Sequence, residues 1–182
     1  MKELSYHILD IVQNSISAGA NLIDIVVNED IYEDKLTIIV NDNGKGMSES
    51  TIEKIKDPFF TSRDTRKVGL GVPLLYAATQ RCQGDLYIDS NLGKGTKIVA
   101  TFKYSHIDRA PLGNIWDTMK VIIGCNEGVD FTYTHIYKDQ SFNIDTREIK
   151  KILKEVPITS PDVLEWIGDY IKDGIKSING GT

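Results

Sequence analysis

Four short segments in the first hundred residues carry side chains that suit nucleotide chemistry. The segment "DIVQN" places Asp10 and Asn14 four positions apart, so both project from one face of a helix. A carboxylate beside a carboxamide can orient a water molecule and hold a hard cation through oxygen. The loops "DNGKGM" (42–47), "GLGV" (69–72) and "GKGT" (93–96) complete the set. Together these segments indicate a Mg-nucleotide site with a carboxylate, a metal ligand and a phosphate cradle.

The loop at 42–47 has two interpretations. The β-branched run 38–40 indicates a buried strand before it, and Asn43-Gly44 is a strong hairpin signal, so a plain turn between strands is one interpretation. The following segment, "SESTIEKI" (48–55), begins with a helix-capping serine and continues with apolar residues at helical spacing. That arrangement of strand, glycine-rich loop and helix favours a ligand loop.

The rest of the first half predicts the elements that would position these loops. Apolar residues recur at helical spacing near the N-terminus, and Gly19 ends that helix. The predicted elements are a helix at 3–18, an antiparallel pair of strands at 22–29 and 35–42, helices at 49–56 and 72–82, and two strands at 84–91 and 96–104.

The character of the sequence changes near Ser105. A linker-like stretch with Pro111 and Gly113 comes first. The segments "MKVIIGC" (119–125) and "VDFTYTHIY" (129–137) predict two strands, and capped apolar patterns predict helices at 145–156 and 160–178. We therefore divide the chain into a site-bearing domain, 1–104, and a small α+β region of unknown role, 105–182.

Composition excludes several classes of protein. The 182 residues, 41% hydrophobic and 26% charged, fit a globular protein of one or two domains. The net charge of −5 provides no basic footprint for nucleic acid. No apolar run approaches the ~20 residues of a membrane span, and the N-terminus lacks the apolar core of a signal peptide. With Cys82 and Cys125 far apart, we expect a cytoplasmic protein without a nucleic-acid or membrane partner.

The motifs, taken in order, resemble those of the Bergerat-fold (GHKL) ATP-binding family, which includes gyrase B, Hsp90, histidine kinases and MutL. The segment "DIVQNSISAGANLIDI" resembles the N box, most closely in its MutL form, and "DNGKGM" resembles the first glycine box. The segments "DPFFTSR", "GLGV" and "GKGT" resemble the F box and later glycine boxes of sensor histidine kinases. The likeness covers residues 3–104. It implies an α/β fold, a two-layer sandwich of a mixed sheet covered on one face by helices.

The resemblance implies how the base would be recognised. Asp42 would accept a hydrogen bond from the adenine amino group, and Thr96 would support Asp42 directly or through an ordered water. Gly44 and Gly46 would let the backbone close around the base, and Met47 would pack against its ring.

The resemblance also implies how the phosphates would be held. Asn14 would coordinate Mg²⁺, and the segment 59–71 would form a lid over ATP. The candidate contacts of the triphosphate in that lid are Gly69, Leu70, Gly71 and, among the basic residues, Arg63, Arg66 and Lys67.

Position 10 departs from the family pattern. Hydrolysing members carry Glu there as a general base, whereas many histidine kinases carry Asn. Aspartate is one methylene shorter than glutamate, which could misplace an attacking water by about 1 Å. Asp10 is our candidate catalytic residue, and a structural residue on the helix surface is the alternative.

Three functions stay open from the sequence. The leading hypothesis is a soluble regulatory kinase that phosphorylates a partner protein. The second is an ATPase switch whose lid closure drives dimerisation or partner docking, and the third is an ATP-binding module without turnover. ATP and Mg²⁺ are the expected ligands, an unidentified protein is the expected partner, and a homodimer stays open. We do not expect a complete sensor kinase, because nothing before residue 3 could form its phosphoacceptor helices.

Overall fold

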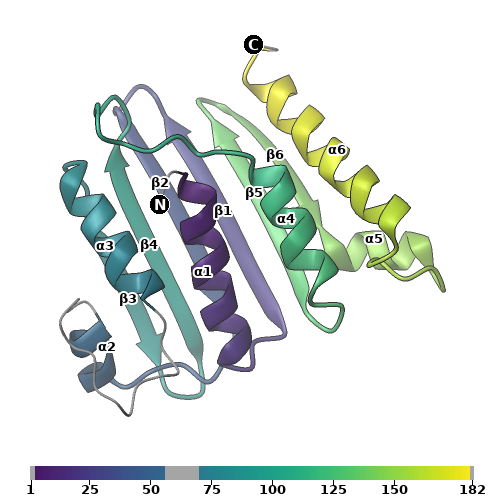
Figure 1. Ribbon diagram of the computed structural model, residues 1–182, viewed down its shortest axis with the longest axis horizontal. Helices are drawn as coiled ribbons and strands as arrows, with labels where there is room; N and C mark the ends of the chain where they lie inside the picture. Colours follow the sequence, from purple (N-terminus) through teal and green to yellow (C-terminus); the bar gives the residue numbers. More distant parts are fainter. Residues whose placement is uncertain (1–2, 56–69, 181–182) are drawn as a thin grey trace.

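The computed structural model describes residues 3–55 and 70–180. In this part of the chain six strands form a single mixed sheet (Figure 1). Its strand order is β3-β4-β2-β1-β5-β6. The pairing of β1 with β5 is parallel, and the other neighbouring strands are antiparallel. The strands are β1 (Leu22–Asp30), β2 (Lys35–Asp42), β3 (Leu86–Asn91), β4 (Gly95–Lys103), β5 (Asp130–Tyr137) and β6 (Gln140–Asp145).

Helices cover one face of this sheet. In Figure 1, α1 lies between α3 and α4 on that face, and α6 lies beside α4 near β6. The predicted α/β fold with helices on one face of a mixed sheet is therefore confirmed. The helices are α1 (Leu4–Ser17), α2 (Glu49–Ile55), α3 (Gly71–Arg81), α4 (Ile115–Gly124), α5 (Thr146–Leu153) and α6 (Pro161–Ile178). None of the helices in the described ranges combines the length and apolar character that a membrane crossing needs.

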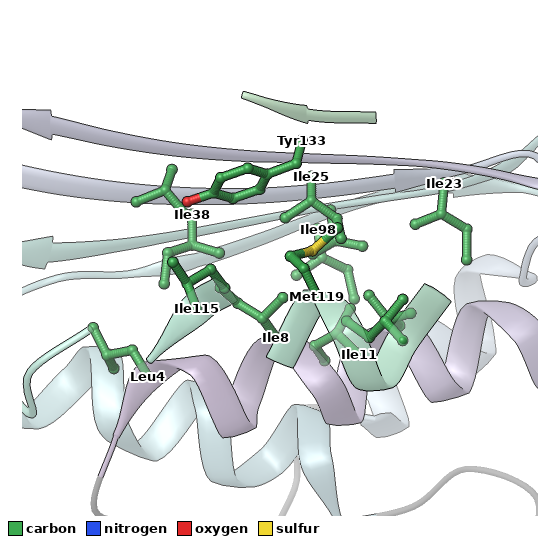
Figure 2. Packing of buried hydrophobic residues seen from close by; sticks show 14 of the residues in the cluster. Leu4, Ile8, Ile11, Ile23, Ile25, Ile38, Ile98, Ile115, Met119 and Tyr133 are labelled. Atoms are coloured by element: carbon green, nitrogen blue, oxygen red, sulfur yellow. The ribbon is translucent and has the colours of Figure 1, made fainter. Parts of the chain in front are cut away.

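The hydrophobic core lies between the buried face of the sheet and the buried face of α1. In β1 every second side chain from Ile23 to Val27 is buried, and in α1 the buried residues recur at helical spacing. Figure 2 shows Leu4, Ile8 and Ile11 of α1 pointing toward sheet residues such as Ile25 and Ile38. Each such side chain contributes about 1.5–3 kcal/mol when it is fully buried. This packing fixes the position of α1, the helix that carries Asp10 and Asn14.

The loop after β2 leads into a helix. Strand β2 ends at Asp42, and the next element is α2 at Glu49. The interpretation as a plain hairpin turn is therefore wrong, because no strand pairs with β2 directly after this loop.

The segment 119–125 is helical, so the strand predicted there is wrong. Residues 115–124 form α4, whose buried side chains include Ile115, Met119, Ile122 and Ile123. These positions follow one helical face, whereas a short apolar run alone does not distinguish a strand from a helix. Strand β6 was not predicted, because the segment 140–145 is mostly polar.

The C-terminal region continues the same sheet. Strand β5 runs parallel to β1, with Leu22 opposite Asp130, and α4 packs against α1. The backbone N–H groups of Leu4 and Ser5, at the start of α1, donate 2.9 Å hydrogen bonds to the carbonyls of Pro111 and Leu112. The linker thus satisfies two donors of the α1 N-terminus. The division of the chain after residue 104 stays a prediction.

Candidate functional site

The buried carboxylate of Asp42 stands at the end of β2. Its Oδ2 atom accepts a 2.6 Å hydrogen bond from the Ser15 hydroxyl of α1, and its Oδ1 atom accepts a 2.8 Å bond from the Gly44 backbone N–H. Thr96 lies opposite Asp42 in the β2–β4 register, and its hydroxyl pairs with that of Ser90 at 2.9 Å. Within the described residues, direct side-chain support for Asp42 thus comes from Ser15.

One side of the loop after Asp42 is fastened to the turn between α1 and β1. The Asn43 Oδ1 atom accepts hydrogen bonds from the backbone N–H groups of Asn21 and Leu22, at 3.0 and 3.1 Å. The Asn43 amide donates to the Asn21 side chain at 2.7 Å, and the Lys45 N–H donates to the Ala18 carbonyl at 2.9 Å. The end of α1 therefore determines where this loop lies.

The other side of the loop is fastened to the β3–β4 turn. The Met47 N–H donates to the Ser90 hydroxyl at 2.8 Å, and that hydroxyl donates to the Gly95 carbonyl at 2.9 Å. The Gly93 N–H donates to the Lys45 carbonyl at 2.7 Å. The two glycine loops predicted at 42–47 and 93–96 are therefore brought together.

Two glycines permit this close packing of backbones. Gly46 has φ +67°, and a Cβ on it would lie 1.9 Å from the Asn91 carbonyl oxygen. Gly95 has φ +94°, and a Cβ there would lie 1.9 Å from the Asp42 carbonyl oxygen. Both conformations favour glycine, and neither position has room for a side chain. The Met47 side chain packs against the core, so its contact with a base stays a prediction.

Asp10 lies against the first residue of α3. A Cβ on Gly71 would lie 2.8 Å from the Asp10 Cβ, so the absence of a side chain there lets α3 approach α1. Partial burial raises the pKa of the Asp10 carboxyl above its ordinary value. The N-cap of α3 is Leu70, which is 61% exposed and supplies no side-chain hydrogen bond to the helix. Asp10 thus lies where a helix N-terminus favours negative charge.

Asn14 lies one helical turn beyond Asp10. Its Nδ2 atom is buried and has no hydrogen-bond partner within the described residues. A buried polar atom without a partner is uncommon, and a carboxamide can turn its oxygen or its nitrogen to such a position. This residue therefore fits a ligand role toward a hydrated cation.

Several predicted contacts lie outside the described residues. They are Arg63, Arg66, Lys67 and Gly69, with the rest of the lid segment that precedes Leu70. Their roles stay predictions.

His7 is deeply buried in α1. It lines a cavity of about 10 Å³ together with Ile8, Ile11 and other apolar residues, and its Nδ1 atom has no partner within the described ranges. Burial is the largest of the causes that lower the pKa of His7 to about 4. With 4% of its surface exposed, His7 is not placed to accept a phosphoryl group.

Sequence reasoning missed three residues that hold the site together: Ser15, Asn43 and Ser90. Ser15 had a signal, because helical spacing places it with Ile8, Ile11 and Val12 on the buried face. A polar residue on an apolar face needs a hydrogen-bond partner, and here that partner is Asp42.

Comparisons with known proteins agree with this geometry. Residues 2–106 match the family described as "Histidine kinase-, DNA gyrase B-, and HSP90-like ATPase". Sporulation kinase A of Bacillus subtilis is 26% identical over 102 residues, covering 55% of this chain and 16% of that protein. Sensor protein kinase FleS of Pseudomonas aeruginosa is 35% identical over 108 residues, covering 59% of this chain and 26% of that protein. Sensor histidine kinase WalK of Bacillus subtilis is 35% identical over 104 residues, covering 52% of this chain and 17% of that protein.

The aligned segment thus spans no more than about a quarter of these relatives. The MutL-like form of the N box stays a prediction. The family match covers more than half of the chain and includes Asp10, Asn14, Asp42 and both glycine loops. The chain therefore belongs to the histidine kinase-, DNA gyrase B- and HSP90-like ATPase family, and its matched part is an ATP-binding, kinase-like ATPase domain.

Proposed function

We propose that this chain binds Mg-ATP between α1, the loop at 42–47 and the start of α3, and that it transfers the γ-phosphate to a partner protein. The observation that carries the proposal is the buried carboxylate of Asp42, held by Ser15 and Gly44. Of the described residues, Asp42 is the buried carboxylate that both glycine loops surround.

Asp42 would read adenine. A carboxylate has about four acceptor positions, and the two hydrogen bonds to Asp42 leave acceptor capacity on both oxygens. An ionised carboxylate cannot donate a hydrogen bond, so it favours the amino group of adenine over the carbonyl that guanine presents at the same position. Thr96 would support this arrangement through Ser90 and the β3–β4 turn.

Asn14 would hold the metal, and the start of α3 would hold phosphate. When bound, Mg²⁺ would neutralise part of the phosphate charge. The Nδ2 atom of Asn14 has no partner within the described residues, and turning the carboxamide over would present its oxygen there as a metal ligand. Gly71 and Leu70 open α3, where the helix dipole favours an anion. Gly69, Arg63 and Lys67 would complete the phosphate contacts.

Transfer to a partner is proposed from the relatives, which are named as kinases. We also propose that the chain works in the cytoplasm, since Cys82 and Cys125 are free thiols.

A second function, an ATPase switch, is favoured by the position of Asp10. The carboxyl lies against the first residue of α3, and burial raises its pKa toward the range in which a general base is effective. In this account Asp10 orients the attacking water, and nucleotide turnover controls dimerisation or docking of a partner.

Purified protein with γ-labelled ATP and Mg²⁺ separates these functions. Label that appears on an added acceptor protein supports the kinase, and steady release of phosphate without an acceptor supports the switch. Saturable binding with neither outcome supports an ATP-binding module. The Asp42→Asn variant is the control for site occupancy, and a wild type without saturable ATP binding would overturn the whole proposal.

A further inference from the structure

The outer side of α6 carries an exposed aromatic pair that the fold holds in place. Trp166 and Tyr170 are 51% and 46% exposed, and their rings stack at 5.2 Å with an interplanar angle of 11°. Tyr170 also meets Phe142 of β6 edge-on at 5.3 Å. Rigid aromatic side chains at the surface lose little entropy on binding and are frequent anchors of protein–protein contacts.

Three aspartates share this side of the helix. Asp162, Asp169 and Asp173 lie four positions before, three after and seven after Trp166, so helical geometry places all of them on the Trp166 face. All three are exposed, and within the described residues none forms an ion pair. The negative charge of Asp162 is also favourable in the first turn of the helix, where the helix dipole is positive. Asp169 and Asp173 lie beyond the first turn, so the helix dipole does not account for their presence.

The buried side of α6 and its flank toward α4 carry further contacts that hold the helix. Its buried side chains include Ile167, Ile171 and Ile175. On the flank toward α4, the Lys120 ammonium pairs with Glu165 at 3.1 Å and also with Asp117 at 3.1 Å. The charges of that flank are therefore matched. The buried isoleucines and the contact of Tyr170 with Phe142 attach the helix to the sheet, whereas Asp162, Asp169 and Asp173 form no ion pair within the described residues.

We propose that Asp162, Trp166, Asp169, Tyr170 and Asp173, here named the α6 outer face, dock an arginine-bearing basic segment of a partner protein. A guanidinium stacks on Trp or Tyr through its flat face and pairs with a carboxylate through its edge. The α6 outer face supplies both groups side by side. Lysine lacks the planar fork and satisfies the two contacts less well.

Charge and position argue for this occupant. A symmetric contact with a second copy would bring the unpaired aspartates against one another, which costs free energy. The face lies outside residues 2–106, the part that matches the family. Figure 1 shows α6 on the far side of α4 from α1 and α3, so a partner there would leave the nucleotide site open.

Peptide titration tests the proposal with the full chain. The probes are an arginine–serine repeat peptide and a lysine–serine peptide of equal length and charge, measured by calorimetry at low ionic strength. The arginine peptide should bind more tightly to the wild type than the lysine peptide does. Trp166→Ala should weaken binding of the arginine peptide roughly 3- to 30-fold. The double variant Asp169→Asn with Asp173→Asn should weaken it roughly 3- to 10-fold.

Matched controls separate this face from general attraction to an acidic protein. Tyr87→Ala removes an exposed aromatic of β3, and Glu33→Gln with Asp89→Asn removes the same charge from exposed positions elsewhere. These controls should change affinity less than about twofold. Equal losses in face and control variants, equal binding of the two peptides, or no binding of the arginine peptide would each overturn the proposal. A wild-type dimer that Trp166→Ala dissociates would overturn it too, because the face would then belong to a second copy.

Discussion

The Ser15 hydroxyl donates a hydrogen bond of 2.6 Å to the Oδ2 atom of Asp42, and both side chains are buried. The bond links α1 to the end of β2, so the helix that carries Asp10 and Asn14 also orients the carboxylate proposed to read adenine. The proposed base recognition and the proposed phosphate chemistry would thereby both depend on the position of α1.

Ser15→Ala should weaken ATP binding roughly 5- to 30-fold, because Asp42 would lose a donor in a buried setting and its carboxylate would keep only the hydrogen bond from the Gly44 N–H. Calorimetric titration of ATP measures this effect. Ser5→Ala is the matched control, since Ser5 is equally buried in α1 but bonds to Glu3. Wild-type affinity in a folded Ser15→Ala protein would contradict the positioning role of Ser15.

Asp42→Asn should weaken ATP binding roughly 10- to 150-fold, because a charge-assisted hydrogen bond is worth on the order of 1.5–3 kcal/mol. The same change should narrow the preference for ATP over GTP, since an amide can donate to the guanine carbonyl. Paired titrations with the two nucleotides give both results, with exposed Asp89→Asn as the control. An unchanged affinity for ATP would remove the adenine assignment.

Gly95→Ala should destabilise the protein more than Gly93→Ala. Both glycines have positive φ, +94° and +76°, so both substitutions carry the left-handed strain of about 1–2 kcal/mol. A Cβ at Gly95 would meet the Asp42 carbonyl, whereas one at Gly93 meets nothing within 4 Å. The clash should lower the free energy of unfolding of Gly95→Ala by roughly a further 1–3 kcal/mol, which urea unfolding measures. It should also reduce the affinity for ATP. Equal effects of the two variants would show that the clash is relieved without disturbing Asp42.

Local patterns predicted much of this fold. Alternating burial in β1 and β2 follows from residues that alternate in sequence, and Asp145 caps α5 by accepting a hydrogen bond from the Arg147 N–H. The antiparallel pairing of β1 with β2 was predicted from the short polar turn between them. These features depend on neighbours in the chain, which is why the sequence alone suffices for them.

Contacts between distant segments were not predictable in the same way. The segment 119–125 contains β-branched residues that suit a strand, but α4 buries its apolar face in contact with α1 and α6, segments distant in the sequence. The parallel pairing of β1 with β5 joins residues more than a hundred positions apart. Within the site, the motifs located Asp42 and the glycines, but the Ser15 bond depends on how α1 packs across the sheet.

His7 should make the protein sensitive to mild acid. Its pKa is lowered from 6.5 to about 4, so the unfolded chain takes up a proton before the folded protein does. This contribution to stability is fully present above pH 6.5 and is lost as the pH falls toward 4. Between pH 7 and pH 5 the free energy of unfolding should fall by roughly 2 kcal/mol more in the wild type than in His7→Leu. Urea unfolding at both pH values measures this, and parallel losses in the two proteins would contradict it.

Substitution of Asn14 should impair the binding of Mg-ATP, whereas substitution of Asp10 should impair hydrolysis. Asn14→Ala should weaken binding of Mg-ATP, because the proposed metal ligand is lost, and the effect should be smaller when Mg²⁺ is left out of the titration. Asp10→Asn should leave binding nearly unchanged and lower hydrolysis about 10²- to 10⁴-fold, the usual value of a general base. Titration calorimetry and phosphate release, run on both variants, measure the two effects.

The pH dependence of hydrolysis gives a second test of Asp10. A general base must be ionised, and burial raises the pKa of this carboxyl above 3.8, so hydrolysis should already fall on the acid side at a pH above 3.8. This fall in hydrolysis at acid pH should be missing from the residual hydrolysis of Asp10→Asn. Wild-type hydrolysis in Asp10→Asn would remove Asp10 from the mechanism and favour direct transfer to a partner. Loss of binding in Asp10→Asn would instead mean that Asp10 shapes the metal site together with Asn14. Only a selective loss of turnover, with binding intact, supports the ATPase switch.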